Sequence, residues 1–355
     1  MKIFYLPLEK IETRYTGQWY DYIPKRLTEY CQQNNLAAEI VTVPGDFDKL
    51  TGTVTKGAFL NFNETNIWKS SQLINLLSHT ISDGDIVFIS DAWNPISIQL
   101  KYIFSLQNIK AKIVGLWHAG NYDQHDFLGR MIGPARWVRN AERSMFESYD
   151  LNFFATEFHR TMFLNSYGLM LTDKRFVTAG FPFDYMCDIL TPFASTEKKN
   201  QIIFPHRIAP EKQLEIFNDL AASLPQYDWV VCQDKKLTKH EYHKALAESK
   251  IVFSANLQET LGISTCIEGP LVNCLPFAPN RLSYAEIFSE YQEFLYPEEW
   301  TESFESYQKH KSQLMNRIVL IMSYYEKFVP ELADFTKNKL PRFINCDKMF
   351  SHIFK

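Results

Sequence analysis

The chain has 355 residues, of which 46% are hydrophobic and 22% are charged, so it is long enough to form two domains with ordinary cores. Its formal net charge of −4 excludes a protein whose whole surface binds nucleic acid, although it leaves room for a local basic patch. Six cysteines without a CxxC pair argue against a zinc site or a disulfide framework.

Segments that address or anchor a protein are not expected. The amino terminus lacks the apolar run and cleavage site of a signal peptide, and no stretch approaches the roughly 20 apolar residues of a membrane span. These features predict a soluble, cytoplasmic protein without membrane association. The sequence gives no indication of oligomeric state.

The first half alternates short apolar runs with stretches of helical spacing. We expect strands at 2–6, 38–43, 85–90, 111–116, 151–155 and 176–179, and helices at 20–34, 70–80 and 156–166. The apolar runs are continuous, as in the strands of a parallel sheet covered on both faces. Ligands of such sheets bind at the carboxyl ends of the strands. Polar residues that follow strands are therefore candidate site residues, among them Asp91, His118 and Asp123.

The second half repeats the alternation after a stretch at 183–200 that is expected to be a linker. Strands are expected at 201–205, 229–232, 251–254 and 275–278, and helices at 211–224, 239–249, 263–272 and 302–328, with a break at Pro341. The pattern predicts an α/β protein with Rossmann-like domains at 1–185 and 186–330. A helical segment at 331–355 is expected to pack back on the amino-terminal domain.

The turn from Pro205 to Lys212 lies between a strand and a helix. Arg207 and Lys212, five residues apart, place two cations near a helix amino terminus. The backbone N–H groups at such a terminus also favour anions. The turn is therefore a candidate diphosphate site, with a solvated charged turn as the alternative.

The segment from Ser254 to Gly269 also follows a strand. Gly262 begins a helix without a side chain, so a ligand can approach the backbone closely. Glu259 precedes this helix and Glu268 lies within it, and carboxylates bind sugar or ribose hydroxyls well. The alternatives are a partner of the helix dipole for Glu259 and a surface residue for Glu268.

These two segments resemble the GT-B-fold retaining glycosyltransferases, whose second domain carries a G-R-x4-K turn and then an E-x7-E motif. In this chain the turn corresponds to 206–212, and the motif to Glu259-Thr260-Leu261-Gly262 through Glu268. The resemblance implies two Rossmann-like domains whose parallel sheets face each other across a cleft. It implies an enzyme that moves a hexose or pentose from a nucleotide-sugar bound by 186–330 to an acceptor bound by 1–185.

The resemblance also implies roles for individual donor-binding residues. Arg207 and Lys212 would bind the diphosphate beside His206, Glu259 would contact the transferred sugar, Glu268 would bind the ribose, and Gly262 and Ile263 would offer backbone N–H groups. Eight residues separate Glu259 from Glu268 where the family has seven. Either the turn absorbs the extra residue, or Thr260 takes the place beside the sugar.

The resemblance implies a catalytic side as well. A histidine that follows a strand of the first domain faces the donor sugar in this family, which points to His118, with a structural histidine as the alternative. Asp91 and Asp123 would position the acceptor hydroxyl, or else act as helix N-caps. No DxD metal motif is convincing, and we expect neither metal nor cofactor. The donor, expected to be a UDP-sugar, is a substrate, and Arg207 and Lys212 would neutralise the departing diphosphate during front-face transfer.

A further stretch narrows the resemblance. The segment from Pro276 to Phe288 resembles the P-N-R-L-x-Y-x-E-x-F stretch of the tRNA-queuosine mannosyltransferase group and of glycosyltransferases from T-even-like bacteriophages. The stretches 12–20 and 117–123 resemble the phage proteins more. This implies DNA modification in a host cytoplasm, with a 5-hydroxymethylpyrimidine such as hydroxymethylcytosine as acceptor. A tRNA-nucleoside glycosyltransferase and a non-catalytic nucleotide-sugar-binding protein are the alternatives.

An acceptor in DNA requires a basic surface. Arg136, Arg139 and Arg143 fall on one face of a helix expected after Pro134, with Arg130 upstream. We expect these four arginines to bind nucleic acid, with a solvated face as the alternative. On the same helix, Trp137 and Met145 are expected to pack inward.

Overall fold

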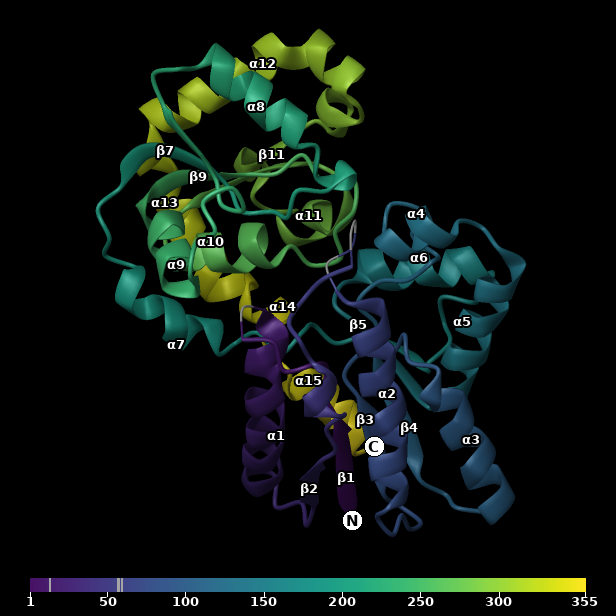
Figure 1. Ribbon diagram of the computed structural model, residues 1–355. Helices are drawn as coiled ribbons and strands as arrows, with labels where there is room; N and C mark the ends of the chain where they lie inside the picture. Colours follow the sequence, from purple (N-terminus) through teal and green to yellow (C-terminus); the bar gives the residue numbers. More distant parts are fainter. Residues whose placement is uncertain (13, 56–57, 59) are drawn as a thin grey trace. The chain divides into compact units, whose positions relative to one another are not determined.

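The computed structural model describes residues 1–355 except 13, 56, 57 and 59 (Figure 1). The chain divides into two compact units. Unit 1 comprises residues 1–155, 160–182 and 346–355, and unit 2 comprises residues 156–159 and 183–345. No helix among the described residues is both long enough and apolar enough to cross a membrane.

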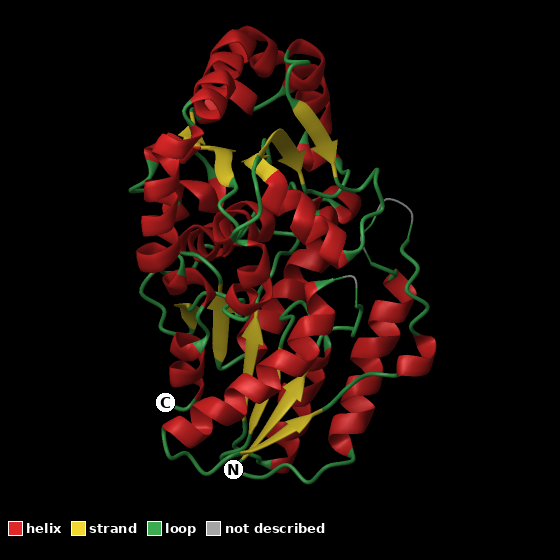
Figure 2. Ribbon diagram, turned by 90° about the vertical axis from the view of Figure 1, so that its left-hand side faces the viewer, coloured by secondary structure: helices red, strands yellow, loops and turns green. Residues whose placement is uncertain are grey.

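Unit 1 is built on a six-stranded parallel sheet in the order β2-β1-β3-β4-β5-β6. Helices lie on both faces of this sheet (Figure 2). The strand order reverses between β1 and β3, and ligands of such sheets bind at this switch point. The strands are β1 (Lys2–Leu6), β2 (Glu39–Thr42), β3 (Ile86–Ile89), β4 (Lys112–Leu116), β5 (Leu151–Phe154) and β6 (Phe176–Thr178).

The helices of unit 1 form two layers. On one side α2, α3 and α5 pack side by side, and on the other α15 packs on α1 (Figure 1). Arg26 on α1 pairs with Asp347 on α15 at 2.5 Å, which fixes the last residues of the chain to unit 1. The helices are α1 (Tyr15–Gln33), α2 (Phe62–Leu77), α3 (Ile96–Gln107), α4 (Phe127–Ile132), α5 (Arg136–Ser148), α6 (Glu157–Tyr167, which starts in unit 2) and α15 (Asp347–Ile353).

Unit 2 repeats this design with a five-stranded parallel sheet in the order β11-β10-β9-β7-β8. Its switch point lies between β7 and β9. The strands are β7 (Lys199–Phe204), β8 (Asp228–Val231), β9 (Ser249–Phe253), β10 (Leu275–Pro279) and β11 (Leu295–Tyr296). The helices are α7 (Met186–Leu190), α8 (Leu214–Ser223), α9 (Lys239–Glu248), α10 (Gly269–Leu271), α11 (Leu282–Ile287), α12 (Phe304–Ser323), α13 (Tyr325–Asp334) and α14 (Pro341–Ile344).

Several expected elements differ from the observed ones for local reasons. The helix expected at 70–80 begins at Phe62, because the side chain of Asn61 caps it by accepting from the N–H groups of Asn63 and Glu64. The expected linker at 183–200 contains α7, which is too short to show periodicity. Pro341 does not break a helix but begins α14, where its missing N–H is not needed.

Candidate active site

The two predicted donor-binding segments meet at the switch point of unit 2. The turn 205–212 follows β7, and the segment 254–262 follows β9, its neighbour in the sheet. The Nζ of Lys212 donates to the carbonyl oxygen of Gln258 at 2.6 Å and lies 3.4 Å from Oε2 of Glu259. Lys212 is 6% exposed, so this ion pair is shielded from solvent.

Glu259 is held from several directions. The side-chain amide of Asn256 donates to its Oε2 at 3.3 Å, and the backbone N–H groups of Thr260 and Gly262 also donate to its carboxylate. Burial alone would raise the pKa of Glu259, but the nearby Lys212 and these hydrogen bonds outweigh burial and lower it. The carboxylate is therefore ionised at neutral pH and can accept hydrogen bonds from hydroxyl groups.

The other predicted residues of the turn also have defined partners. Arg207 donates to Oε1 of the fully buried Glu211 at 2.5 Å. His206 donates from Nε2 to the carbonyl oxygen of Phe253 at 3.1 Å, which ties the turn to the end of β9. Burial and the charge of Lys212 lower the pKa of His206 to about 3, so its ring is neutral at physiological pH. Cations at this turn thus come from Arg207 and Lys212.

Gly262 has a backbone that favours glycine. Its φ of +79° is in the left-handed region. A Cβ at this position would lie 2.9 Å from Cε1 of Tyr284 and 3.0 Å from Sγ of Cys266. The neighbouring Thr260 is buried, and its carbonyl oxygen accepts from the hydroxyl of Thr156 at 3.0 Å.

Part of the stretch between Glu259 and Glu268 forms a π-helix. The segment Ile263–Glu268 forms this helix directly after Gly262. A π-helix holds one more residue per turn than an α-helix and is the usual form in which a single insertion enters a helix. In this segment Glu259, and not Thr260, has its carboxylate beside Lys212.

Glu268 lies inside unit 2 and contacts two residues of α9 that the sequence did not single out. The hydroxyl of Tyr242 donates to Oε2 of Glu268 at 2.5 Å and lies 3.0 Å from Oγ of Ser264. Nε2 of His243 lies 3.7 Å from Oε1 of Glu268. Burial, followed by the charge of Glu268, raises the pKa of Tyr242 well above its ordinary value, so Tyr242 remains a hydrogen-bond donor. The capping box of Thr238 and Glu241, which begins α9, is the sequence signal for the helix that carries these residues.

Arg281, in the Pro276–Phe288 stretch, has a structural role. Its guanidinium donates to the carbonyl oxygens of Asn256, Ala255, Glu298 and Thr301 at 2.9–3.0 Å. It therefore fixes the loop after β9 against the segment after β11. The Pro276–Phe288 stretch therefore holds the loop that carries Glu259 in place through Arg281.

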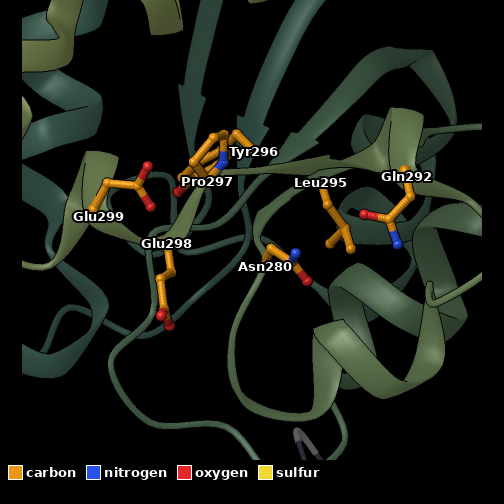
Figure 3. A pocket seen from close by; sticks show the side chains of 7 residues that line it. All are labelled: Asn280, Gln292, Leu295, Tyr296, Pro297, Glu298 and Glu299. Carbon is orange, nitrogen blue, oxygen red and sulfur yellow. The ribbon is translucent and has the colours of Figure 1, made fainter.

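A hollow of about 580 Å³, a volume that includes its open mouth, lies at the carboxyl ends of β10 and β11. In Figure 3, Glu298 and Glu299 lie on one side of it and Asn280, Leu295 and Gln292 on the other. None of its lining residues is a cation, and none belongs to the cluster around Lys212. Two carboxylates without a cation suit a diphosphate poorly, so we place the candidate donor site at Lys212.

In unit 1, Asp91 and His118 lie near each other beyond β3 and β4. Oδ2 of Asp91 pairs with Nζ of Lys69 at 2.8 Å. Burial would raise the pKa of Asp91, but the charge of Lys69, together with the hydrogen bonds from Lys69 and from the N–H of Trp93, outweighs burial and lowers it. Nε2 of His118 lies 2.7 Å from the carbonyl oxygen of Ser90, which can only accept, so Nε2 carries the proton. Nδ1 then accepts from the hydroxyl of Tyr15 at 3.0 Å.

The protonation of His118 follows from its surroundings. Burial lowers its pKa, and the opposing effect of Asp91 is smaller. Its ring is therefore neutral at physiological pH. Asp123 lies elsewhere in its loop, where its Oδ1 accepts from the N–H of His125 at 2.9 Å, which is a turn-forming bond.

The four predicted arginines lie on or beside α4 and α5. Arg136 and Arg143 are exposed, whereas Arg139 is half-buried. Arg139 and Arg143 donate to the carbonyl oxygens of Ser166 and Tyr167 at 2.5 and 3.2 Å, and Arg130 donates to that of His125 at 3.2 Å. Part of the basic face is thus committed to packing.

Trp137 contradicts the expected packing. It is 60% exposed, whereas Met145 is buried as expected. In α5, residue 137 lies beside the exposed positions 140 and 144 on the helical wheel and not beside the buried Val138 and Met145. Glu142, the carboxylate of this segment, is buried and accepts from Nε1 of Trp93 at 2.8 Å. The exposed surface of α5 therefore includes an aromatic ring that the sequence did not predict there, while the carboxylate of Glu142 lies inside.

Among the described residues, we find no group of three or more His, Cys, Asp and Glu side chains arranged to hold a metal ion. No protein-family model and no curated protein sequence matches the chain.

Solved structures do resemble the chain along almost its entire length. The sucrose-phosphate synthase of Thermosynechococcus elongatus has a TM-score of 0.65 at 10% identity, covering 99% of this chain and 97% of the other. The UDP-forming trehalose-phosphate synthase of Burkholderia xenovorans has a TM-score of 0.60 at 10% identity, covering 99% and 98%. HepE of Anabaena, in complex with UDP-glucose, has a TM-score of 0.59 at 12% identity, covering 99% and 98%.

The match to a chain of the GtfA/B complex is partial. This chain covers 61% of that one, with 13% identity and a TM-score of 0.53. At such identities the likeness concerns the fold. The predicted fold class is confirmed: the chain has the GT-B fold, with two Rossmann-like domains built on parallel sheets.

Proposed function

We propose that this chain is a metal-independent, retaining glycosyltransferase in which unit 2 binds a nucleotide-sugar and unit 1 binds the acceptor. The observation that carries the proposal is the meeting of Lys212, Arg207 and Glu259 at the switch point of unit 2. Two cations can hold a diphosphate there, and an ionised carboxylate can hold sugar hydroxyls. The likeness to HepE, whose structure contains UDP-glucose, supports a UDP-sugar as donor.

The proposed chemistry is transfer on one face of the sugar. The bond between the anomeric carbon and the diphosphate oxygen breaks while the bond to the acceptor oxygen forms. Lys212 and Arg207 stabilise the negative charge that develops on the departing diphosphate. An oxygen of that diphosphate takes the proton of the acceptor hydroxyl.

Other residues bind and orient the reactants. Glu259, beside Lys212, contacts the transferred sugar, and Glu268, held by Tyr242, binds the ribose. In unit 1, the neutral His118 faces the donor sugar, and the ionised Asp91 positions the acceptor hydroxyl. Asp123 is a weaker candidate for that role, because its carboxylate is engaged in a local turn.

The proposed acceptor is a 5-hydroxymethylpyrimidine base in DNA. The exposed residues of α5 support this proposal, because Arg136, Arg143 and Trp137 are all exposed there. Arginine side chains bind phosphates, and an exposed aromatic ring can stack on an unpaired base. A base inside a duplex must be unpaired before its hydroxymethyl group is reached.

The test is an acceptor panel under one set of conditions. The full chain is incubated with UDP-glucose and, in turn, with DNA that contains 5-hydroxymethylcytosine, with unmodified DNA and with tRNA. A hexose mass gain on the hydroxymethylated DNA alone supports the proposal, and a gain on tRNA alone assigns the acceptor to the tRNA-nucleoside class. The absence of UDP binding and of UDP-glucose turnover would contradict the enzyme and favour a non-catalytic protein.

A further inference from the structure

A small recess lies at the switch point of unit 1. It is lined by residues that follow β1 and β3, the two strands between which the sheet order reverses. Its walls include the ring of the buried Trp68, and its polar lining comprises Glu9, Lys69, Gln72, Asp91 and Asn94. All five of these polar side chains belong to unit 1. The recess therefore occupies the place in this sheet where Rossmann-like domains bind ligands.

Most polar groups of the recess already have protein partners. Nζ of Lys69 donates to Oδ2 of Asp91 at 2.8 Å and to the carbonyl oxygen of Trp93 at 2.6 Å. The amide of Gln72 donates to the carbonyl oxygens of Pro7 and Val43. The charges of Lys69 and Asp91 thus offset each other.

Glu9 is the exception. It is 4% exposed, and its Oε1 has no hydrogen-bond partner among the described residues. A buried carboxylate oxygen without a donor is costly, because it has lost water without gaining a replacement. A ligand that donates a hydrogen bond to this oxygen would supply what the protein does not.

The recess restricts the chemistry and size of that ligand. The described lining of the recess has two carboxylates, Glu9 and Asp91, against one cation, Lys69, so it suits a phosphate poorly. A carboxylate can accept hydrogen bonds from a hydroxyl or an amino group. The cavity volume of about 10 Å³, room for about one water-sized group, is far below the range of roughly 300–1,000 Å³ for sites that enclose a whole small molecule. One functional group can therefore enter while the rest of the molecule stays outside.

We propose that Glu9 binds the hydroxyl group of the acceptor, with Oε1 accepting its hydrogen bond. The inference rests on the proposed glycosyltransferase function and names a residue that selects the acceptor. Glu9 thereby distinguishes a hydroxymethyl group from a methyl group. The neighbouring Asp91, held by Lys69, completes the polar side of the recess.

The test compares two oligonucleotides that differ in one oxygen atom. Transfer from UDP-glucose to an oligonucleotide with 5-hydroxymethylcytosine is measured in the presence of the same oligonucleotide with 5-methylcytosine as competitor. For the wild type we expect the hydroxymethyl oligonucleotide to bind about tenfold or more tightly than the methyl competitor. The free energy of a hydrogen bond to a charged group corresponds to a factor of that order. Glu9→Met should remove most of this preference, and Glu9→Gln should reduce it.

A matched control is Glu39→Gln, an exposed glutamate at the first position of β2, at the opposite edge of the same sheet. It should keep the wild-type preference. UDP affinity, measured by calorimetry, and the melting temperature report on unit 2 and on folding, and Glu9→Gln serves if Glu9→Met does not fold.

The outcomes separate this inference from the proposed function. A folded Glu9→Met variant with an unchanged preference would overturn the inference and show that Glu9 is a structural carboxylate. UDP binding by a wild type that transfers to no hydroxymethylated oligonucleotide would also overturn it. A wild type that does not bind UDP would contradict the proposed function itself.

Discussion

The switch points of the two units use charge differently. In unit 2, Lys212 pairs with Glu259 and Arg207 with Glu211. In unit 1, Lys69 pairs with Asp91, but one oxygen of Glu9 has no hydrogen-bond partner within the described part of the chain. The paired cluster can hold its geometry before a charged donor arrives, whereas the unpaired carboxylate suits an uncharged group that donates a hydrogen bond. The same fold thus offers one site for a diphosphate and another for a hydroxyl.

Removing a cation from the paired cluster should have the largest effect. We expect Lys212→Ala to lower kcat/KM for UDP-glucose turnover by about 100-fold or more, because the diphosphate loses a charge partner in a buried site. Lys244→Ala, on the exposed side of α9, is the control and should retain normal turnover. Equal kcat/KM values for the two variants would contradict a role of Lys212 in binding the donor.

The acid sensitivity of unit 2 should depend on His206. Its pKa of about 3 in the folded state lies below that of an unfolded histidine, so the unfolded chain binds a proton that the folded chain does not. Stability attributable to His206 is therefore full above about pH 6.5 and falls by about 2 kcal/mol by pH 5. The stability that carboxylates such as Glu259 contribute is lost only at still lower pH, below the ordinary pKa of a glutamate, since their pKa values are lowered in the folded state.

Urea denaturation at pH 7.5 and pH 5 checks this prediction. His206→Gln should reduce the loss of unfolding free energy between these pH values, and His240→Gln, an exposed residue of α9, should leave it unchanged. A loss that is the same in both variants would mean that other groups cause it.

A substitution at Gly262 should have the next largest effect, on stability and on UDP binding. Gly262→Ala combines a left-handed φ with a close approach to Tyr284, so we expect destabilisation of about 1–3 kcal/mol and weaker UDP binding. Gly168→Ala is a matched control, because its φ is +64° but the space around it is open. Chemical denaturation of both variants tests the comparison, and equal losses of stability would rule out a role for packing at Gly262.

A smaller effect is expected where the partner of a binding residue is removed. Tyr242→Phe deletes the hydroxyl that holds Glu268, and we expect UDP to bind about tenfold more weakly, as for loss of a hydrogen bond to a charged group. Tyr102→Phe, on the exposed surface of α3, should bind UDP like the wild type. Calorimetric titration with UDP measures the affinity of both variants. An unchanged affinity in Tyr242→Phe would contradict the proposed contact between Glu268 and the nucleotide.

The smallest effect should come from the basic face of unit 1. Arg136→Glu should weaken binding of single-stranded DNA and lower the slope of log Kd against log salt by about one or more, because the side chain contacts phosphate. Trp137→Ala should weaken binding by about tenfold with little change in the slope, because base stacking is not ionic. Arg139→Glu is less informative, since Arg139 also holds the carbonyl oxygen of Ser166. Fluorescence anisotropy at several salt concentrations measures the Kd of each variant for single-stranded DNA. Values equal to those of the wild type in both Arg136→Glu and Trp137→Ala would contradict the proposed DNA-binding face.

The sequence predicted the features that depend on continuous patterns. Buried apolar runs predicted the strands of both sheets except the two-residue β11, and the spacing of Arg207 and Lys212 located the turn at the unit 2 switch point. The close approach of Lys212 to Glu259 could be anticipated, because the ends of parallel strands meet at one edge of a sheet.

The rest depends on packing that no local pattern encodes. The π-helix that ends at Glu268 has no signature in the spacing of apolar residues, which is the same as for an α-helix of that length. Tyr242 and Glu9 reach their places through tertiary contacts across long stretches of chain. Trp137 is exposed although tryptophan is usually buried, because α5 uses Val138 and Met145 for its inner face.

The most direct test of the central claim is calorimetric titration of the full chain with UDP, side by side with Lys212→Ala and Lys244→Ala. We predict saturable binding of one UDP per chain by the wild type and by Lys244→Ala, and loss of that binding in a folded Lys212→Ala. No binding by the wild type, or equal binding by Lys212→Ala, would contradict a donor site at the switch point of unit 2.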